Sequence, residues 1–359
     1  MTKNKTVCIA TFCEWGSYGS IMQAIGLKKT LNVLGFDSFI VRDKAAPPTT
    51  INFSLKLSSS LKQLFKNFIN LFLFNYTKKR YYSCNQFIRD NLDCIYYNDY
   101  ETLKKYPPAA DYYITGSDQV WNPVSCNPAF FLDFVQKHQR LSYAASMGTT
   151  AIPAVKQTQF ESFLNSIDAI SVRESDIVEF LKKYTTHDIK VHIDPTFLIS
   201  ANQWREFMQP YPIQKTYILV FPLYWDSKLN KELKTLRRKS NIPVIALCTD
   251  VSKVWADQKI YDASPAQFLW LIDNAEAVIS SSFHGIALAL NLNKKISAVI
   301  NPQAPSRIES LLNSLNVPKY NISSVFDFDI SQYDNINVKI GTEKSQSIKY
   351  LKEILHVEK

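Results

Sequence analysis

Polar side chains follow an apolar run in the stretch DYYITGSDQVWNP, residues 111–123. The run is typical of a buried strand that stops at Gly116, and the polar and aromatic residues after it are Ser117, Asp118, Gln119, Trp121 and Asn122. A carboxylate at a strand end can accept a proton from a sugar hydroxyl, and an indole can stack on a sugar ring. The alternative is that Asp118 caps a helix and Trp121 fills the core.

A histidine stands at a second strand-to-helix turn, in SSSFHGIALAL, residues 280–290. Here Ser281 or Ser282 caps a helix whose first turn carries His284, and Gly285 permits close approach to the backbone. Free N–H groups at a helix N-terminus and an imidazole can bind the same anion. We therefore expect His284 to hold an anion or to move a proton.

Two glycines mark a third turn, CEWGSYGS, residues 13–20, where Gly16 and Gly19 flank Ser17 and Tyr18. Its backbone N–H groups could bind an anion or a sugar hydroxyl at the start of the next helix. A tight strand-to-helix turn that needs two glycines is an equal alternative, and the pattern is not the dinucleotide fingerprint GxGxxG.

Strand and helix patterns alternate along the chain and would bring these turns together. VCIATF (7–12) reads as a strand, a helical pattern then runs to Gly35, and FDSFIV follows as a second strand, so a parallel sheet is predicted. The proline-containing stretch QPYPIQK (209–215) precedes a second alternation. We predict an α/β fold of two Rossmann-like lobes, residues 1–208 and 209–359, that face each other across a cleft. Ligands of such sheets bind beyond the carboxyl ends of the strands.

Length and composition agree with this prediction. The chain has 359 residues, more than one core usually fills, and 46% hydrophobic with 20% charged residues indicates a packed globular protein. A net charge of +9 could favour binding to nucleic acid, to an anionic membrane face or to a small anionic substrate. Because the lysines are spread along the chain and no nucleic-acid motif is present, we expect no nucleic-acid partner.

Targeting and metal-binding signals are weak. The six cysteines are scattered without a CxxC pair, so neither disulfides nor a structural metal is expected. The short apolar run before Glu14 suits a first strand better than a signal peptide, and no window reaches 18 uncharged apolar residues. We expect a cytoplasmic protein.

The segment 55–82 combines a helical Leu/Phe pattern with flanking lysines and Arg80. Such a helix can pack its apolar face on the protein core or on a partner. It can also lie on an anionic bilayer surface, which would place the protein at the inner face of the membrane.

Taken together and in this order, these segments resemble the polysaccharide pyruvyl transferase family. The resemblance runs from Val7 to about Val325 and rests on WGSYGSIMQAIGLKKTL, DYYITGSDQVWNP, LSYAASMG, SVRES, HIDPTFLIS, IYDASPAQFLWLIDNAEAVISSSFHG and SRIESLLNSLNV. GSDQVWNP and SFHG at this separation are its specific parts. The resemblance implies a fold like that of the GT-B glycosyltransferases, with the acceptor on the first lobe and phosphoenolpyruvate on the second.

The activity that the resemblance implies is transfer of the enolpyruvyl group of phosphoenolpyruvate onto two hydroxyls of a sugar, as a cyclic ketal. It implies no cofactor or metal, and an acceptor that is a glycan or a lipid-linked sugar of a cell-surface polysaccharide. It assigns Arg173 of SVRES and His284 of SFHG to the donor site. We expect His284 to act as acid or phosphate ligand and Asp118 as base or acceptor ligand.

The other substrate-binding residues that we expect are Gly16, Ser17, Tyr18, Ser117, Gln119, Trp121, Asn122, Ser282, Gly285 and Arg307. Some branches of the family carry Arg at the position of Ser282, and Arg307 or a lysine would supply the cation that is missing here.

Two alternatives from other functional classes stay open. One is a GT-B glycosyltransferase that uses a nucleotide sugar, although KKISAVINPQAPS after the SFHG helix has no Glu to bind a ribose. The other is a non-catalytic module that binds an anionic glycan in the same cleft.

Overall fold

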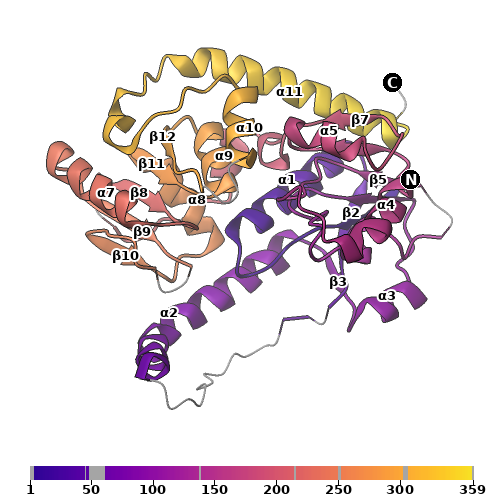
Figure 1. The fold of residues 1–359 in the computed structure, drawn as a ribbon, viewed down its shortest axis with the longest axis horizontal. Helices are drawn as coiled ribbons and strands as arrows, with labels where there is room; N and C mark the ends of the chain where they lie inside the picture. The colour runs from indigo at the N-terminus through magenta and orange to yellow at the C-terminus, as the bar shows by residue number, and fades with distance from the viewer. Residues whose placement is uncertain are drawn as a thin grey trace.

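The computed structural model describes residues 4–44, 46–47, 61–136, 139–213, 216–249, 252–301 and 306–357, and within them the chain forms two five-stranded parallel sheets (Figure 1). The first sheet has the order β3-β2-β1-β4-β5 and the second the order β10-β9-β8-β11-β12, so the two follow the same winding. The predicted α/β fold of two Rossmann-like lobes is therefore confirmed.

The strands of the first sheet are β1 (Thr6–Ala10), β2 (Asp37–Arg42), β3 (Cys94–Tyr96), β4 (Tyr112–Thr115) and β5 (Arg140–Ser142). Those of the second are β8 (Ile218–Phe221), β9 (Val244–Leu247), β10 (Gln258–Ile260), β11 (Ala277–Ser280) and β12 (Lys295–Ala298). A parallel pair, β6 (Ile170–Val172) and β7 (Ile189–Val191), continues the first sheet through isolated bridges beyond β5.

The α-helices are α1 (Tyr18–Val33), α2 (Leu61–Asn91), α3 (Tyr100–Lys105), α4 (Gln157–Asn165), α5 (Val178–Leu181), α6 (Ala201–Arg205), α7 (Ser227–Ser240), α8 (Pro265–Asp273), α9 (Phe283–Asn291), α10 (Ser306–Ser314) and α11 (Gln332–Ile354). Short 3-10 turns are η1 (Pro128–Phe131), η2 (Ala154–Lys156), η3 (Ser175–Ile177), η4 (Pro195–Phe197) and η5 (Ile322–Asp327).

The central strands of the second sheet are buried along their whole length. In β8, β9 and β11 every residue is buried, which is the pattern of parallel sheets rather than the alternation of half-exposed ones. The helices that follow begin at side-chain caps. Ser17 accepts a hydrogen bond from the Ser20 N–H at the start of α1, and Ser282 accepts one from the Gly285 N–H at the start of α9.

The two lobes meet along α1, η4 and α9. Tyr18 of α1 donates its hydroxyl hydrogen to the Ala263 carbonyl at 2.6 Å, and its ring stacks on Phe268 of α8 with centroids 4.7 Å apart. The turn η4 lies between α1 and α9: Asn291 at the end of α9 donates to the carbonyl of Thr196 in η4. One continuous apolar core joins both lobes through these contacts.

The last helix, α11, returns to the first lobe and crosses the top of Figure 1 in yellow. Its Tyr350 donates to the carbonyl of Ser142 in β5 at 3.0 Å, and its Ser347 hydroxyl accepts from the Ile193 N–H at 3.3 Å. The two sheets fall on either side of residue 209, and the domain boundary predicted there stays a prediction. Helix α11, from the C-terminal part of the chain, nevertheless helps to cover the first lobe.

The basic segment 55–82 falls partly outside the described residues, since nothing is described of 55–60 or of the side chains before Leu73. In its described part, α2 contacts the second lobe. The buried Arg80 donates to the carbonyls of Cys248, Thr249 and Tyr261, and Lys79 pairs with Asp262 at 2.7 Å. These contacts match the packing alternative for the end of the segment, and membrane contact stays a prediction.

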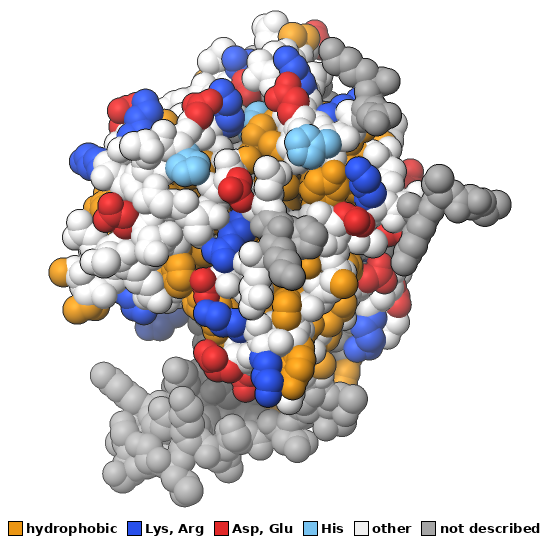
Figure 2. Space-filling model, turned by 90° about the vertical axis from the view of Figure 1, so that its right-hand side faces the viewer, with side chains coloured by type: hydrophobic (Ala, Val, Ile, Leu, Met, Phe, Trp, Pro, Cys, Tyr) orange, Lys and Arg blue, Asp and Glu red, His pale blue; other side chains and the backbone are white. Residues whose placement is uncertain are grey.

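Charges of both signs are interspersed over the described surface in Figure 2. Among the helices that the structure describes, none is long and apolar enough to cross a membrane.

Candidate active site

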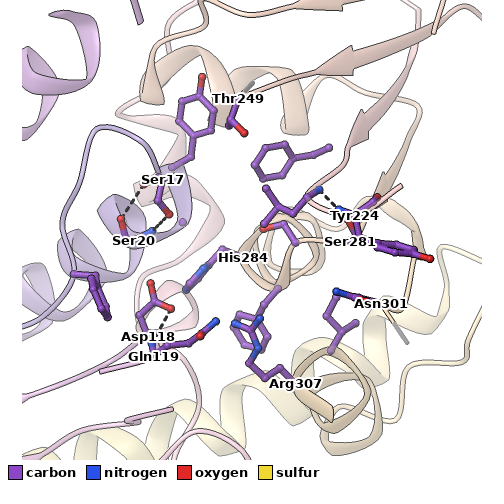
Figure 3. Close-up of a pocket in the computed structure, with 18 of the residues that line it drawn as sticks. Ser17, Ser20, Asp118, Gln119, Tyr224, Thr249, Ser281, His284, Asn301 and Arg307 are labelled. Carbon is purple, nitrogen blue, oxygen red and sulfur yellow. Dashed lines mark hydrogen bonds between the residues drawn. The ribbon is translucent and has the colours of Figure 1, made fainter. Parts of the chain in front are cut away.

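A cavity of about 370 Å³ lies between the lobes at the carboxyl ends of the strands (Figure 3). In both sheets the winding reverses beside the central strand, between β1 and β4 in one and between β8 and β11 in the other. Loops that diverge from neighbouring parallel strands leave a crevice there. The loops after all four strands line the cavity, together with the starts of α1, α9 and α10.

Most of the predicted site residues line this cavity. They are Gly16, Ser17, Tyr18, Asp118, Gln119, Ser282, His284 and Arg307. Figure 3 shows Asp118, Gln119, His284 and Arg307 close together, while Ser17, Thr249, Tyr224 and Asn301 lie around the rest of the cavity. The cavity thus has one part where Asp118, His284 and Arg307 meet and another with mostly neutral side chains.

His284 reaches the charged part from the first turn of α9 and contacts the first lobe. A Cβ atom built on Gly19 would lie 2.3 Å from His284 Nδ1, so only a glycine lets the imidazole lie against α1. On the other side, His284 Nε2 is 3.5 Å from Asp194 Oδ2, at the outer limit of a hydrogen bond. The imidazole is buried and lies between the two lobes.

Asp194 is the centre of a buried polar cluster just behind the cavity. Its Oδ2 accepts hydrogen bonds from Arg173 Nη1 at 2.9 Å and Ser117 Oγ at 3.2 Å. Its Oδ1 accepts from the backbone N–H and the hydroxyl of Thr196 at 2.9 and 2.8 Å. Burial alone would raise the pKa of Asp194, but the His284 imidazole, the Arg173 guanidinium and the Thr196 N–H hold this pKa well below its usual value.

Arg173 does not line the main cavity. Its Nε donates to Glu174 Oε1 at 2.8 Å, its guanidinium carbon is 3.8 Å from the centroid of the Phe283 ring, and it borders a separate crevice of about 50 Å³. Burial lowers the pKa of Arg173, but Glu174 and Asp194 raise it by more, so the side chain is a fixed cation. In the described structure Arg173 and His284 both face the carboxylate of Asp194, and the expectation that they hold one external anion stays a prediction.

Arg307 is the guanidinium that does border the cavity. It comes from the first turn of α10, and with the carboxamide oxygen of Gln119 turned towards it, Nη1 and Nη2 donate to that oxygen at 2.6 and 3.1 Å. Burial and the neighbouring Arg173 lower the pKa of Arg307, whereas Glu174 and Asp118 act in the opposite direction. Its Nε is buried without a hydrogen-bond partner in the described structure.

Asp118 lies beside this pair at the end of β4. Its backbone has φ of 69°, in the left-handed region, and its Oδ1 accepts from the Gln119 N–H at 2.9 Å. The carboxylate is only partly buried and borders the cavity. A general base needs such access to a substrate hydroxyl.

The other predicted residues lie elsewhere. Trp121 is fully buried, donates to the Phe130 carbonyl at 3.2 Å and stacks on Phe131, so the prediction that it stacks on a sugar is wrong and the core alternative holds. Gly285 faces Ser280, since a Cβ there would lie 2.6 Å from Ser280 Oγ.

Ser117 and Asn122 also lie outside the cavity lining. Ser117 is fully buried behind the cavity, where its single hydroxyl hydrogen is shared between the Ala144 carbonyl at 2.7 Å and Asp194 Oδ2 at 3.2 Å. Asn122 accepts from the Val124 N–H at 3.0 Å and holds the turn after Gln119.

Several residues of the site were not predicted from the sequence, among them Asp194, Glu14, Thr249 and Tyr224. Asp194 ends the stretch KVHID just before a proline, and Glu14 follows the first strand, so both stand near strand ends as Asp118 does. Glu14 lines the cavity and pairs with Lys44 and with Arg42. Burial would raise the pKa of Glu14, but these two cations lower it.

Among the described residues, no group of His, Cys, Asp and Glu side chains is arranged to hold a metal ion.

Two solved structures illustrate the likeness of the fold. The UDP-GlcNAc 2-epimerase from Neisseria meningitidis, solved with UDP-GlcNAc, has 12% identity and a TM-score of 0.55 over 99% of this chain and 100% of its own. A putative UDP-N-acetylglucosamine 2-epimerase from Listeria monocytogenes has 10% identity and a TM-score of 0.54 over 100% of this chain and 98% of its own. At such identities the likeness shows the fold, which is GT-B-like.

Curated proteins gave no significant match to the sequence. The model of the family described as polysaccharide pyruvyl transferase matches residues 18–301, which is more than half of the chain and includes the cavity-lining residues from Tyr18 of α1 to Asn301 after β12. The chain therefore belongs to the polysaccharide pyruvyl transferase family.

Proposed function

We propose that the protein transfers the enolpyruvyl group of phosphoenolpyruvate to two hydroxyls of a sugar, as a ketal, and releases inorganic phosphate. The observation that carries this proposal is the charged part of the cavity, where His284, Arg307 and Asp118 converge from α9, α10 and the end of β4. Family membership supports a transferase acting on a polysaccharide or its precursor.

The charged part suits a small anion with a phosphate and a carboxylate. Arg307 offers a planar guanidinium for either group. The N-termini of α9 and α10 point partial positive charge towards the same region, and each helix has nine residues. The neutral part, with Ser17, Thr249 and Tyr224, suits the hydroxyls and ring faces of a glycan or lipid-linked sugar.

The reaction needs an acid and a base in addition to these cations. One sugar hydroxyl adds to C2 of the donor while the methylene carbon takes up a proton and becomes a methyl group. The second hydroxyl then displaces phosphate from C2, and its proton leaves with the phosphate. We assign to Asp118 the removal of a hydroxyl proton, and to His284 the delivery of a proton or the binding of the phosphate.

The test is an assay of acceptor-dependent phosphate release with phosphoenolpyruvate and a panel of soluble and lipid-linked glycans, with product masses read by mass spectrometry. A product that carries a pyruvate ketal supports the proposal. His284→Ala should lower the rate by about 10² to 10⁴, whereas His187→Ala, away from the cavity, should leave it unchanged. Sugar transfer from a UDP sugar, with no ketal from phosphoenolpyruvate, would overturn it.

Donor binding can be checked without knowing the acceptor. Phosphoenolpyruvate at 100 times its Kd should add about 2.7 kcal/mol to the free energy of unfolding, which is visible as a thermal shift. A shift with UDP sugars and none with phosphoenolpyruvate would favour the glycosyltransferase alternative.

A further inference from the structure

We propose that Asp194 is a positioning residue that fixes the tautomer and orientation of His284, with Nε2–H directed at the Asp194 carboxylate and Nδ1 left to act on the ligand of the cavity. This inference deepens the proposed function and, for its catalytic consequence, rests on it. Three features of the structure carry it.

First, the two ring nitrogens of His284 have different surroundings. Nε2 is buried and has no hydrogen-bond partner at normal distance in the described structure, and Asp194 Oδ2 at 3.5 Å is the acceptor that it faces. Nδ1 lies against Gly19, which itself lines the cavity. Hydrogen bonds of catalytic groups are often long before the substrate binds, so 3.5 Å is compatible with a contact that tightens on binding.

Second, Asp194 is held so firmly that it can orient its neighbour. Four hydrogen bonds reach its two oxygens, from Ser117, Arg173 and Thr196. The residue is almost fully buried, and it directly precedes η4, which lies between α1 and α9. The carboxylate therefore keeps its place relative to both lobes.

Third, the chemistry of the pair leaves one tautomer. An ionised carboxylate only accepts hydrogen bonds, so the ring nitrogen that faces it must carry a hydrogen. In neutral His284 the lone pair is then on Nδ1, and in the protonated ring Nδ1–H is the acid directed at the ligand. Without Asp194 either nitrogen could carry the hydrogen.

Other charged side chains also surround the His284 ring. Arg173 and Glu174 form an ion pair behind Asp194, and Asp118 and Arg307 border the cavity in front. Arg173 acts here through Asp194, because its Nη1 holds Oδ2 in place. This gives Arg173 a function although it borders a different crevice.

The decisive experiment reads the tautomer directly and needs no substrate. Histidine-selective ¹⁵N labelling gives separate Nδ1 and Nε2 shifts, and the His284 signals are those lost in His284→Gln. In the parent protein at alkaline pH we expect His284 to be the Nε2–H tautomer. In Asp194→Asn one carboxylate oxygen is replaced by an NH2 group, which donates hydrogen bonds and does not accept them, so the Nδ1–H fraction should rise several-fold.

A milder variant covers the case in which Asp194→Asn does not fold. Thr196→Val keeps the backbone N–H and the shape of the side chain but removes the hydroxyl donor to Oδ1. It should increase the Nδ1–H fraction by a smaller amount. Thr185→Val, a buried threonine that the Asp194 hydrogen bonds do not include, is the matched control and should leave the His284 shifts unchanged.

The kinetic consequence separates positioning from a structural role. In folded Asp194→Asn, kcat for phosphate release should fall by about 10- to 10³-fold with a smaller change in KM for phosphoenolpyruvate. Should no pyruvyl transfer exist, the tautomer result still decides this inference. An Nδ1–H parent, or a folded Asp194→Asn with unchanged His284 shifts, overturns it whether or not the rate falls.

Discussion

At the scale of single residues, Gly19 makes the sharpest prediction, because it leaves the space that the His284 ring occupies. In Gly19→Ala the new Cβ would lie 2.3 Å from His284 Nδ1, so the ring must move. A displacement of about 1 Å can cost about 10² in rate. Phosphate release should fall by that order while the protein stays folded. Gly341→Ala, with nothing within 4 Å of its Cβ in α11, is the control and should keep full activity.

Arg307 provides a second test at the same scale. Arg307→Lys keeps the positive charge but loses the planar pair of donors that Gln119 holds. We expect KM for phosphoenolpyruvate to rise about 10-fold or more, with a smaller change in kcat, since a hydrogen bond to a charged group is worth about 1.5–3 kcal/mol. Arg238→Lys on the exposed face of α7 should change neither value. Unchanged KM in Arg307→Lys would exclude donor binding by this side chain.

Residue types at strand ends were enough to place His284 and Asp118 at the cavity, because polar groups that end buried parallel strands meet at one edge of a sheet. Arg307 was expected only from the family resemblance, as a substitute for a cation at position 282, and it also lines the cavity. Residue types did not predict the hydrogen-bond partners of Arg173 and Trp121. Both stand at strand ends or near them. The internal carboxylate of Asp194 accepts a hydrogen bond from Arg173, and the Phe130 carbonyl accepts one from the Trp121 indole N–H. Which partner a buried polar group finds depends on contacts between distant segments.

At the scale of elements, the contact of α11 with the first lobe contains a titratable group, His192. The ring stacks on Tyr350 with centroids 4.4 Å apart, and its Nδ1 lies 3.3 Å from Ser347 Oγ. Burial, helped by Lys190, lowers the pKa of His192 from 6.5 to about 4. Between these two values the unfolded chain binds a proton that the folded chain does not, so the free energy of unfolding should fall as the pH is lowered from about 6.5 to 4.

Denaturant unfolding of the parent and of His192→Phe at several pH values checks this prediction. Phenylalanine keeps the stacking but cannot titrate. The parent should lose more stability than the variant on acidification through this window, so the difference between them should change steadily with pH. Parallel curves would show that His192 carries none of the acid sensitivity.

The alternation of strands and helices was visible in the sequence because fully buried parallel strands are short apolar runs between polar turns. The packing of α11 on the first lobe could not be predicted, because the apolar positions of a helix do not indicate which lobe they cover. Tyr350 and Leu351 are buried against a part of the protein that is far away in the chain.

At the scale of the whole molecule, this packing of α11 limits the independence of the first lobe. A fragment of residues 1–208 lacks Tyr350, Leu351 and Leu355, all buried in the full chain, and lacks the helices that cover Tyr18. We expect the fragment alone to aggregate or to unfold without a cooperative transition. Adding the 209–359 fragment should restore cooperative unfolding. A 1–208 fragment as stable as the full chain would contradict the packing described for α11.

Tyr18 has a consequence for how molecules enter and leave. Its ring forms part of the cavity wall, while its hydroxyl and its face are anchored in the opposite half on Ala263 and Phe268. Separating the two lobes would break the contacts of Tyr18 with Ala263 and Phe268 and would also remove part of the cavity wall. We therefore expect ligands to enter through the mouth of a largely preassembled chamber, without the two halves having to swing open each time.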